Sequence, residues 1–562
     1  MIRTRQGQTA AAAPEPAGDV YRKLAGRIED RASALARHPV YGPFVRSGLV
    51  LGIAVGFETV LMRASRLPAT AYEAPFFATA PLRVLAGSGM FGLLALGIGV
   101  ILAVAAVVTR STGPRWSDFE HVARMRWLIG ALAAVLAWVF ASYDYNYYFD
   151  QSHGLERALL IALVPLVVWR PVFTLVFLAV LFPIGLQFAQ PIGGFSWAPA
   201  SLPVRVLVLF SAWWLVRLVT KRVRSADVLF VLCCLIAAHY WVSGWEKLGL
   251  GWVEDDRIGF LVASTYANGW LGFLDPATIG SLVRRMLAMN VPMKAATLLI
   301  ECGALFMLWR RATVRWFLVA AIGLHIAIFL LTGIGFWQWV IVDALVLLLF
   351  FRRTSPAVPI FTQPRFLLSL VLIGFGAIWF RPTPLAWLDA RATYTYRFEA
   401  VGENGRTHPL PPAFFSPYDY QFTLGAFRYL VDAPRLPVTW GATNDRRVTA
   451  GLNEASSPDR ILELEAELGR NDYDAERART FERFVAAFVG TWQGHGGRDG
   501  WLAPLQAPAS LWTFPRSDPA LGGERIERVI VYEVLSFFDG ARYVEIRKLP
   551  IREIPLDLVK PR

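Results

Sequence analysis

Long apolar stretches recur along the first two thirds of the chain, separated by short polar loops. A helix needs about 20 mostly apolar residues to cross a bilayer, and several stretches approach that length. They are residues 45–63, 82–109, 127–143, 155–169, 172–190, 202–216, 227–245, 291–309, 316–333, 337–351 and 366–380. Because some are short enough to be tilted or broken, the pattern predicts a polytopic α-helical membrane bundle of about 9–11 spans.

The loops between these stretches alternate in charge. Arginine and lysine cluster in residues 110–126, 217–224, 310–315 and 352–365. The intervening loops, "YDYNYYFDQSH", "PIGGFSWAPAS" and "TGIGFWQW", are aromatic and nearly free of basic residues. Cytoplasmic loops of membrane proteins carry the excess of Lys and Arg. The pattern therefore predicts that the N-terminus lies in the cytoplasm and that the chain after the last span lies outside it.

The chain changes character after residue 381. The segment "TYTYRFEAV" (393–401) alternates like a strand, and residues 528–549 read as two strands around an Asp-Gly turn. Between them, residues 472–492 have the periodicity of an amphipathic helix. We therefore expect three parts: a cytoplasmic N-terminal tail with an amphipathic helix (1–44), the transmembrane bundle (45–381) and an extracytoplasmic α+β domain (382–562).

Composition supports a membrane protein and narrows the partners. Hydrophobic residues make up 55% of the chain and charged residues 18%, against about 25% charged residues in soluble domains. The net charge of +13 is accounted for by the basic loops, and no basic tract interleaved with aromatic residues indicates nucleic-acid binding. We expect membrane lipid as a partner and no nucleic acid.

Three cysteines, all in apolar stretches, provide no disulfide framework for the outer part. No pair of histidines has the spacing of a helical metal site, so no metal is expected.

Ionisable residues inside a membrane cost at least about 2.5–3.5 kcal/mol each, so a functional role is the first hypothesis for them. Here they are Glu58, His153, His239, Glu246, Lys247, Glu301, His325 and Asp343.

The position of Lys247 allows two interpretations. It can be a lysine that extends to the lipid headgroups beside Glu246. It can instead be a general base, because burial disfavours the charged form of an amine and leaves it free to accept a proton. His325, in the middle of its apolar stretch, suits a helix–helix hydrogen bond, a proton relay or a contact to a polar substrate.

Three segments around these residues resemble a known family. The stretch "YWVSGWEKLGLGWV" (240–253) resembles the Tyr-x-x-x-Gly-x-x-Lys-Leu-x-x-x-Trp-Val signature of the vitamin K-dependent gamma-glutamyl carboxylases. Their bacterial relatives, the HTTM (horizontally transferred transmembrane) proteins, share it. Residues 301–336 match in the spacing of an acidic residue and a histidine, and residues 151–164 give a weaker third match. The similar region spans roughly residues 120–350.

The resemblance implies an activity. Lys247 would be the catalytic base acting on a reduced quinone of the vitamin K or menaquinol type, with His325 and His153 near the same site. A protein, peptide or small substrate would be modified on the extracytoplasmic side of a bacterial inner membrane. Glu246 departs from the family, because the animal enzyme has a second lysine there. We therefore expect an integral membrane enzyme of the gamma-carboxylase-like lyase or oxidoreductase type.

A non-catalytic alternative remains open. The chain can be a membrane scaffold or accessory subunit that binds a partner through its outer domain. A transporter is disfavoured, because no inverted repeat is visible in the sequence.

Overall fold

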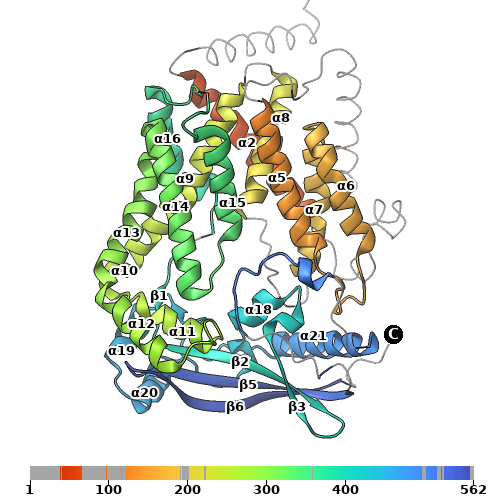
Figure 1. The fold of residues 1–562 in the computed structure, drawn as a ribbon, viewed down its shortest axis with the longest axis vertical. Coiled ribbons are helices and arrows are strands. Elements are labelled where there is room, and N and C mark those ends of the chain that lie inside the picture. The colour runs from red at the N-terminus through yellow and green to blue at the C-terminus, as the bar shows by residue number, and fades with distance from the viewer. Residues whose placement is uncertain are drawn as a thin grey trace, which may run out of the picture.

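In the computed structural model, the structure describes residues 41–65, 122–189, 201–220, 223–356, 358–383, 385–496, 502–514 and 524–556, with residues 38, 97, 116, 192 and 521 as single positions. A helical bundle forms one half of the molecule, and a four-stranded sheet with its own helices forms the other (Figure 1). The expected span at 82–109 and the amphipathic helix expected within residues 1–44 lie outside the described residues.

The bundle surrounds one central helix. Its helices are α2 (Tyr41–Ala64), α5 (Val122–Ala141), α6 (Gly154–Trp169), α7 (Phe173–Ala189), α8 (Leu202–Val219), α9 (Ser225–Leu250), α13 (Asn290–Gly303) with the 3₁₀ turn η3 (Ala304–Trp309), α14 (Arg311–Thr332), α15 (Trp337–Val346) with the π-helical turn η4 (Leu347–Phe351), α16 (Gln363–Gly374) and α17 (Gly376–Trp379). Helix α9 is buried along most of its length, and 89% of its most apolar window is inside the protein. A helix that is apolar all round belongs in such a core.

Five helices of the described residues are long and apolar enough to cross a membrane, and this is compatible with a membrane protein. They are Tyr41–Ala64, Ala123–Ala141, Ser225–Gly249, Asn290–Trp309 and Arg311–Thr332. The count is smaller than the 9–11 spans expected, because apolar stretches are not always single long helices. Helix α6 ends at Trp169, since a residue before a proline leaves the helical conformation and Pro171 follows Arg170. Phe375 separates α16 from α17.

The arginine-rich loops gather at one end of the bundle. The turns between α8 and α9, η3 and α14, and η4 and α16 all lie at the end opposite the sheet (Figure 1). At this end Asp227, on α9, accepts hydrogen bonds from Arg46 Nε (3.0 Å) and Arg365 (2.7 Å). These ion pairs tie α2 and α16 to the central helix, and a buried carboxylate with two cationic partners is well compensated.

The half of the molecule that contains the sheet, residues 385–556, is called the outer half below. Its antiparallel sheet has the strand order β3-β2-β5-β6, beside a separate two-stranded pair of β1 and β4. The strands are β1 (Leu388–Asp389), β2 (Ala392–Gly402), β3 (Thr407–Leu410), β4 (Ala442–Thr443), β5 (Ile526–Phe538) and β6 (Tyr543–Pro555). The predicted strand at 393–401 and the predicted hairpin around Asp539-Gly540 are both confirmed.

Helices and short turns cover the sheet. They are α18 (Asp419–Leu424), α19 (Arg446–Glu454), α20 (Pro458–Leu468), α21 (Ala475–Gly494) and the 3₁₀ turns η5 (Pro412–Phe415), η6 (Arg428–Leu430) and η7 (Ala503–Leu505). The helix predicted at 472–492 is confirmed as α21, which begins where Asp474 accepts hydrogen bonds from two backbone N–H groups of its first turn. Its apolar face packs on the sheet, as its amphipathic pattern requires.

The two halves are joined by an insertion and by aromatic loops. The short helices α10 (Trp252–Asp255), α11 (Gly259–Ala267) and α12 (Pro276–Ala288) lie between α9 and α13, at the end of the bundle that faces the sheet (Figure 1). The aromatic loop after α5 also reaches the outer half, where Tyr148 stacks on Phe484 with ring centroids 5.0 Å apart. A site at this junction can therefore draw residues from both halves.

Candidate functional site

Lys247 lies in the last turns of α9 and points into the protein. The residue is 8% exposed, and its Nζ donates a hydrogen bond of 2.5 Å to Glu301 Oε1 on α13. Glu246, the partner considered from the sequence, is exposed. Close approach of the two helices requires Gly244, because a Cβ there would lie 2.9 Å from the Cβ of Glu301. Lys247 is therefore a buried lysine paired with an acid from another helix.

A tryptophan ring lies close to both Lys247 and a second buried lysine. The Trp252 ring centroid is 5.7 Å from Lys247 Nζ and 5.8 Å from Lys294 Nζ, within the range of cation–π attraction. Lys294 donates hydrogen bonds to the backbone carbonyls of residues 252, 253 and 256, so it holds the turn after α9 in place. Lys294 was not among the candidate residues predicted from the sequence. Its signal is the seven-residue spacing to Glu301, which places both side chains on one helical face.

His325, on α14, lies in an aromatic cluster beside this pair. Its ring centroid is 5.5 Å from that of Tyr240, 4.8 Å from Phe336 and 5.4 Å from Trp339. The hydroxyl of Tyr240 donates to Asp343 Oδ2 at 2.6 Å and lies 3.4 Å from His325 Nδ1. Asp343 is fully buried. A hydrogen-bonded path thus runs from His325 through Tyr240 to Asp343.

The lysine pair and the histidine path are linked through α9, which carries both Lys247 and Tyr240. Tyr240 lies within the motif at 240–253, although no role was predicted for it from the sequence. Its signal is that it lies seven residues before Lys247, on the same face of α9.

His239 joins the same cluster from α9. Its Nδ1 lies 2.8 Å from the Leu235 carbonyl, and its ring packs edge-on against Trp339, with centroids 5.1 Å apart. The ring is held by its own helix, as expected of a core histidine.

His153 lies elsewhere in the bundle. It precedes α6 with a left-handed backbone (φ 49°), and its ring packs between Phe149 and Phe188. The helix that follows it and α13 lie at opposite sides of the bundle (Figure 1). Burial, and secondarily the charge of Arg157, lowers the pKa of His153 to about 4. The structure therefore does not bring His153 together with Lys247 and His325, because matching spacing along the chain does not fix which helices are neighbours.

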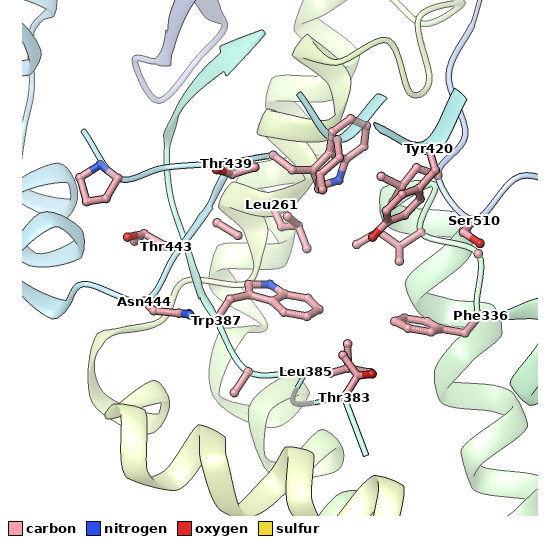
Figure 2. Close-up of a pocket in the computed structure, with 18 of the residues that line it drawn as sticks. Leu261, Phe336, Thr383, Leu385, Trp387, Tyr420, Thr439, Thr443, Asn444 and Ser510 are labelled. Carbon is pink, nitrogen blue, oxygen red and sulfur yellow. The ribbon is translucent and has the colours of Figure 1, made fainter. Parts of the chain in front are cut away.

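A cavity of about 980 Å³ lies between the bundle and the outer half. Phe336 and Trp339 form part of its wall, and both also contact the His325 ring. In Figure 2 the side chains of Trp387, Phe336 and Tyr420 lie around the hollow. The histidine path is thus separated from the cavity only by aromatic side chains.

Two buried carboxyl groups lie behind the Trp387 wall. The backbone N–H of Asp389 donates to Asp256 Oδ1 at 2.6 Å, and Trp387 Nε1 donates to Asp389 Oδ1 at 3.0 Å. Burial raises the pKa of Asp256 to about 6. Burial, with the charge of Asp256 as the next cause, raises the pKa of Asp389 well above its ordinary value. This carboxyl pair links α10 to β1 and orients the cavity wall.

Within the part of the chain that the structure describes, no group of three or more His, Cys, Asp or Glu side chains is arranged to hold a metal ion.

Comparison with known proteins gives no relative. No family model, no curated protein and no solved structure matches the chain. The chemistry has to be inferred from the geometry of the site.

Proposed function

We propose that the chain is an integral membrane enzyme whose proton-accepting centre is the pair formed by Lys247 and Glu301. The observation that carries the proposal is this 2.5 Å pair, with side chains only 10% and 8% exposed, beside the His325 path. The reaction proposed is of the gamma-carboxylase-like lyase or oxidoreductase type, on a reduced quinone of the vitamin K or menaquinol type.

The proposed setting is a bacterial inner membrane. About 9–11 spans would cross it, with the N-terminus in the cytoplasm and the sheet outside. The arginine-rich turns at the end of the bundle opposite the sheet support this orientation. The Lys247 pair lies toward the sheet, so its substrate would arrive from the extracytoplasmic side.

The pair is suited to taking up a proton. Two opposite charges buried together gain little over their neutral forms, because desolvation offsets much of their attraction. A single proton shared by the amine and the carboxylate leaves the pair neutral overall. When the pair accepts a second proton, its charge rises to +1 and stabilises the negative charge left on the group that gave the proton. This is general base catalysis by a positioned pair.

Glu301 has one oxygen that can accept a hydrogen bond from a hydroxyl donor. Glu301 Oε2 is buried and has no hydrogen-bond partner among the described residues. An orphaned acceptor of this kind costs about 1–3 kcal/mol unless a donor reaches it. A reduced quinone, when bound, supplies an acidic hydroxyl group and a ring that reacts with oxygen. Glu301 would hold the hydroxyl and Lys247 would lie beside it to share the proton.

The neighbouring path supplies further groups that can hold or pass a proton. Tyr240 contacts both His325 and Asp343, so it can pass a proton between them. Asp343 Oδ1 has no partner among the residues that the structure describes, which leaves it able to accept one. We assign Tyr240 and Asp343 as positioning residues of the centre.

The test replaces the base and measures turnover. Lys247→Met keeps the length of the side chain and removes the amine, and Lys294→Met removes the second lysine near the Trp252 ring. Both proteins would be purified in lipid nanodiscs with a menaquinol analogue, and quinol consumption would be followed. Lys247→Met is expected to lose about 10²–10⁴-fold of the rate, the usual contribution of a general base. The Lys294→Met protein, where folded, is expected to lose much less of its rate, because Lys294 binds backbone carbonyls and not Glu301.

Unchanged quinol consumption in a folded Lys247→Met protein would remove the proposal. The non-catalytic scaffold would then be the better description of the chain.

A further inference from the structure

The cavity between the two halves is lined by polar groups that lack partners. Trp440 is 4% exposed, and its indole N–H has no hydrogen-bond partner among the described residues. The Ser201 hydroxyl, at the start of α8, also lines the cavity and has no hydrogen-bond partner among the described residues. Leaving a buried donor unpaired costs about 1–3 kcal/mol. These groups therefore favour a ligand that offers oxygen atoms to them.

The walls of the cavity are aromatic, and its remaining polar lining is mostly neutral. Trp387, Tyr420 and Phe336 present their rings to the hollow (Figure 2). Hydroxyl and amide groups lie among them, including those of Thr383 and Asn444, which Figure 2 also shows at its margin. Small-molecule sites usually combine such apolar walls with a few well-placed polar groups.

The charged groups at the rim are already neutralised. Arg470 donates to Asp445 at 2.6 Å, Arg446 to Asp255 at 2.6 Å and Arg428 to Asp472 at 2.9 Å. Each guanidinium is thereby oriented by a carboxylate and keeps further N–H groups for hydrogen bonding. The paired rim favours a neutral, polar ligand over an anion.

We propose that this cavity binds a saccharide, either free or as the headgroup of a lipid. A sugar ring has a C–H face that packs on an indole, and hydroxyl groups around its edge that both donate and accept. A flat aromatic ring with two oxygens would fill the aromatic walls but leave most of the polar lining unpaired. The volume, about 980 Å³, lies at the upper end of the roughly 300–1,000 Å³ of small-molecule sites. The inference does not depend on the proton-transfer reaction proposed above.

The experiment measures binding in the full-length protein in phosphatidylcholine nanodiscs. Maltose and chitobiose serve as free probes in saturation-transfer NMR, and a glucosyl diacylglycerol added to the nanodisc serves as the lipid-linked probe. Trp440→Phe removes the indole N–H and keeps an aromatic ring. Trp270→Phe is the matched control, because its indole N–H is also buried and without a partner among the described residues, yet Trp270 does not line the cavity.

At least one probe is expected to bind, and Trp440→Phe is expected to weaken it about 5–10-fold, the effect of one hydrogen bond. Trp387→Ala is expected to weaken it more than tenfold, and Trp270→Phe to leave it unchanged. Binding of the free sugars or of the glycolipid identifies which source is recognised.

The proposal is overturned if none of the three probes binds the wild-type protein. It is equally overturned if Trp440→Phe binds as tightly as Trp270→Phe, since the sugar would then lie elsewhere. Neither result bears on quinol consumption, so the failure of this proposal and that of the proposed function can be told apart.

Discussion

Replacing Glu301 by glutamine isolates the charge of the buried pair from its packing. The substitution keeps the size of the side chain and an oxygen that can accept from Lys247. It removes the negative charge that faces the amine of Lys247, whose side chain is only 10% exposed. Removing one partner of a buried ion pair typically costs about 3–5 kcal/mol, because the other charge is left uncompensated. An exposed pair would cost less than about 1 kcal/mol.

A double-mutant cycle with Lys247→Met measures the coupling directly. Each single variant leaves one buried group without its partner, and the double variant leaves neither charge. The double variant should therefore lose less stability than the two single variants together, by up to about 3 kcal/mol. The free energies of unfolding would be taken from SDS titrations in mixed micelles. Strictly additive effects of the two single substitutions would show that the pair is exposed to water. A loss of less than about 1 kcal/mol in the free energy of unfolding for Glu301→Gln would show the same, and either result would refute a buried, coupled pair.

Two further predictions use the same unfolding measurements. Gly244→Ala should lower the free energy of unfolding by about 1–3 kcal/mol, because its Cβ would overlap the neighbouring helix. Gly249→Ala on the same helix is the control, since its Cβ meets open space and the change should be neutral or stabilising. Equal effects of the two substitutions would contradict the close contact at Gly244. A carboxyl group whose pKa is raised by folding binds more protons in the folded state than in the unfolded state. Its contribution to the free energy of unfolding is therefore highest below its unfolded-state pKa, near 4. For Asp256 this contribution falls as the pH rises toward its folded-state pKa of about 6. Asp389→Asn removes one member of that carboxyl pair and should make the decline shallower between pH 4 and pH 8; an unchanged slope would show that the pair does not titrate as described.

Much of the architecture could be predicted because it depends on local patterns. Continuous apolar residues predicted the central helix α9, and alternation around Asp539-Gly540 predicted the β5–β6 hairpin. Helix ends were less accurate, since proline and π-helical turns shorten helices inside apolar stretches. The insertion of α10 to α12 was not foreseen, because its amphipathic helices depend on the outer half for their packing.

The site was only partly accessible from the sequence. Lys247 and His325 were singled out by their position in apolar helices and by the motif. Glu301 was also among the ionisable residues singled out, but its pairing with Lys247 was not predicted, because Glu301 lies 54 residues further along the chain and only helix packing brings the two together. His153 shows the reverse, since its motif spacing suggested a shared site that the helix arrangement does not form.

The central claim is that the amine of Lys247 is held against Glu301, away from water and lipid headgroups. Reductive methylation of the folded protein in nanodiscs, with mass spectrometry of each lysine, tests it most directly. Lys548, whose side chain is 35% exposed on the outer sheet, supplies the internal reference. We predict that Lys548 is methylated while Lys247 remains unmodified until the protein unfolds. Methylation of Lys247 at the rate of Lys548 in the folded protein would contradict the account.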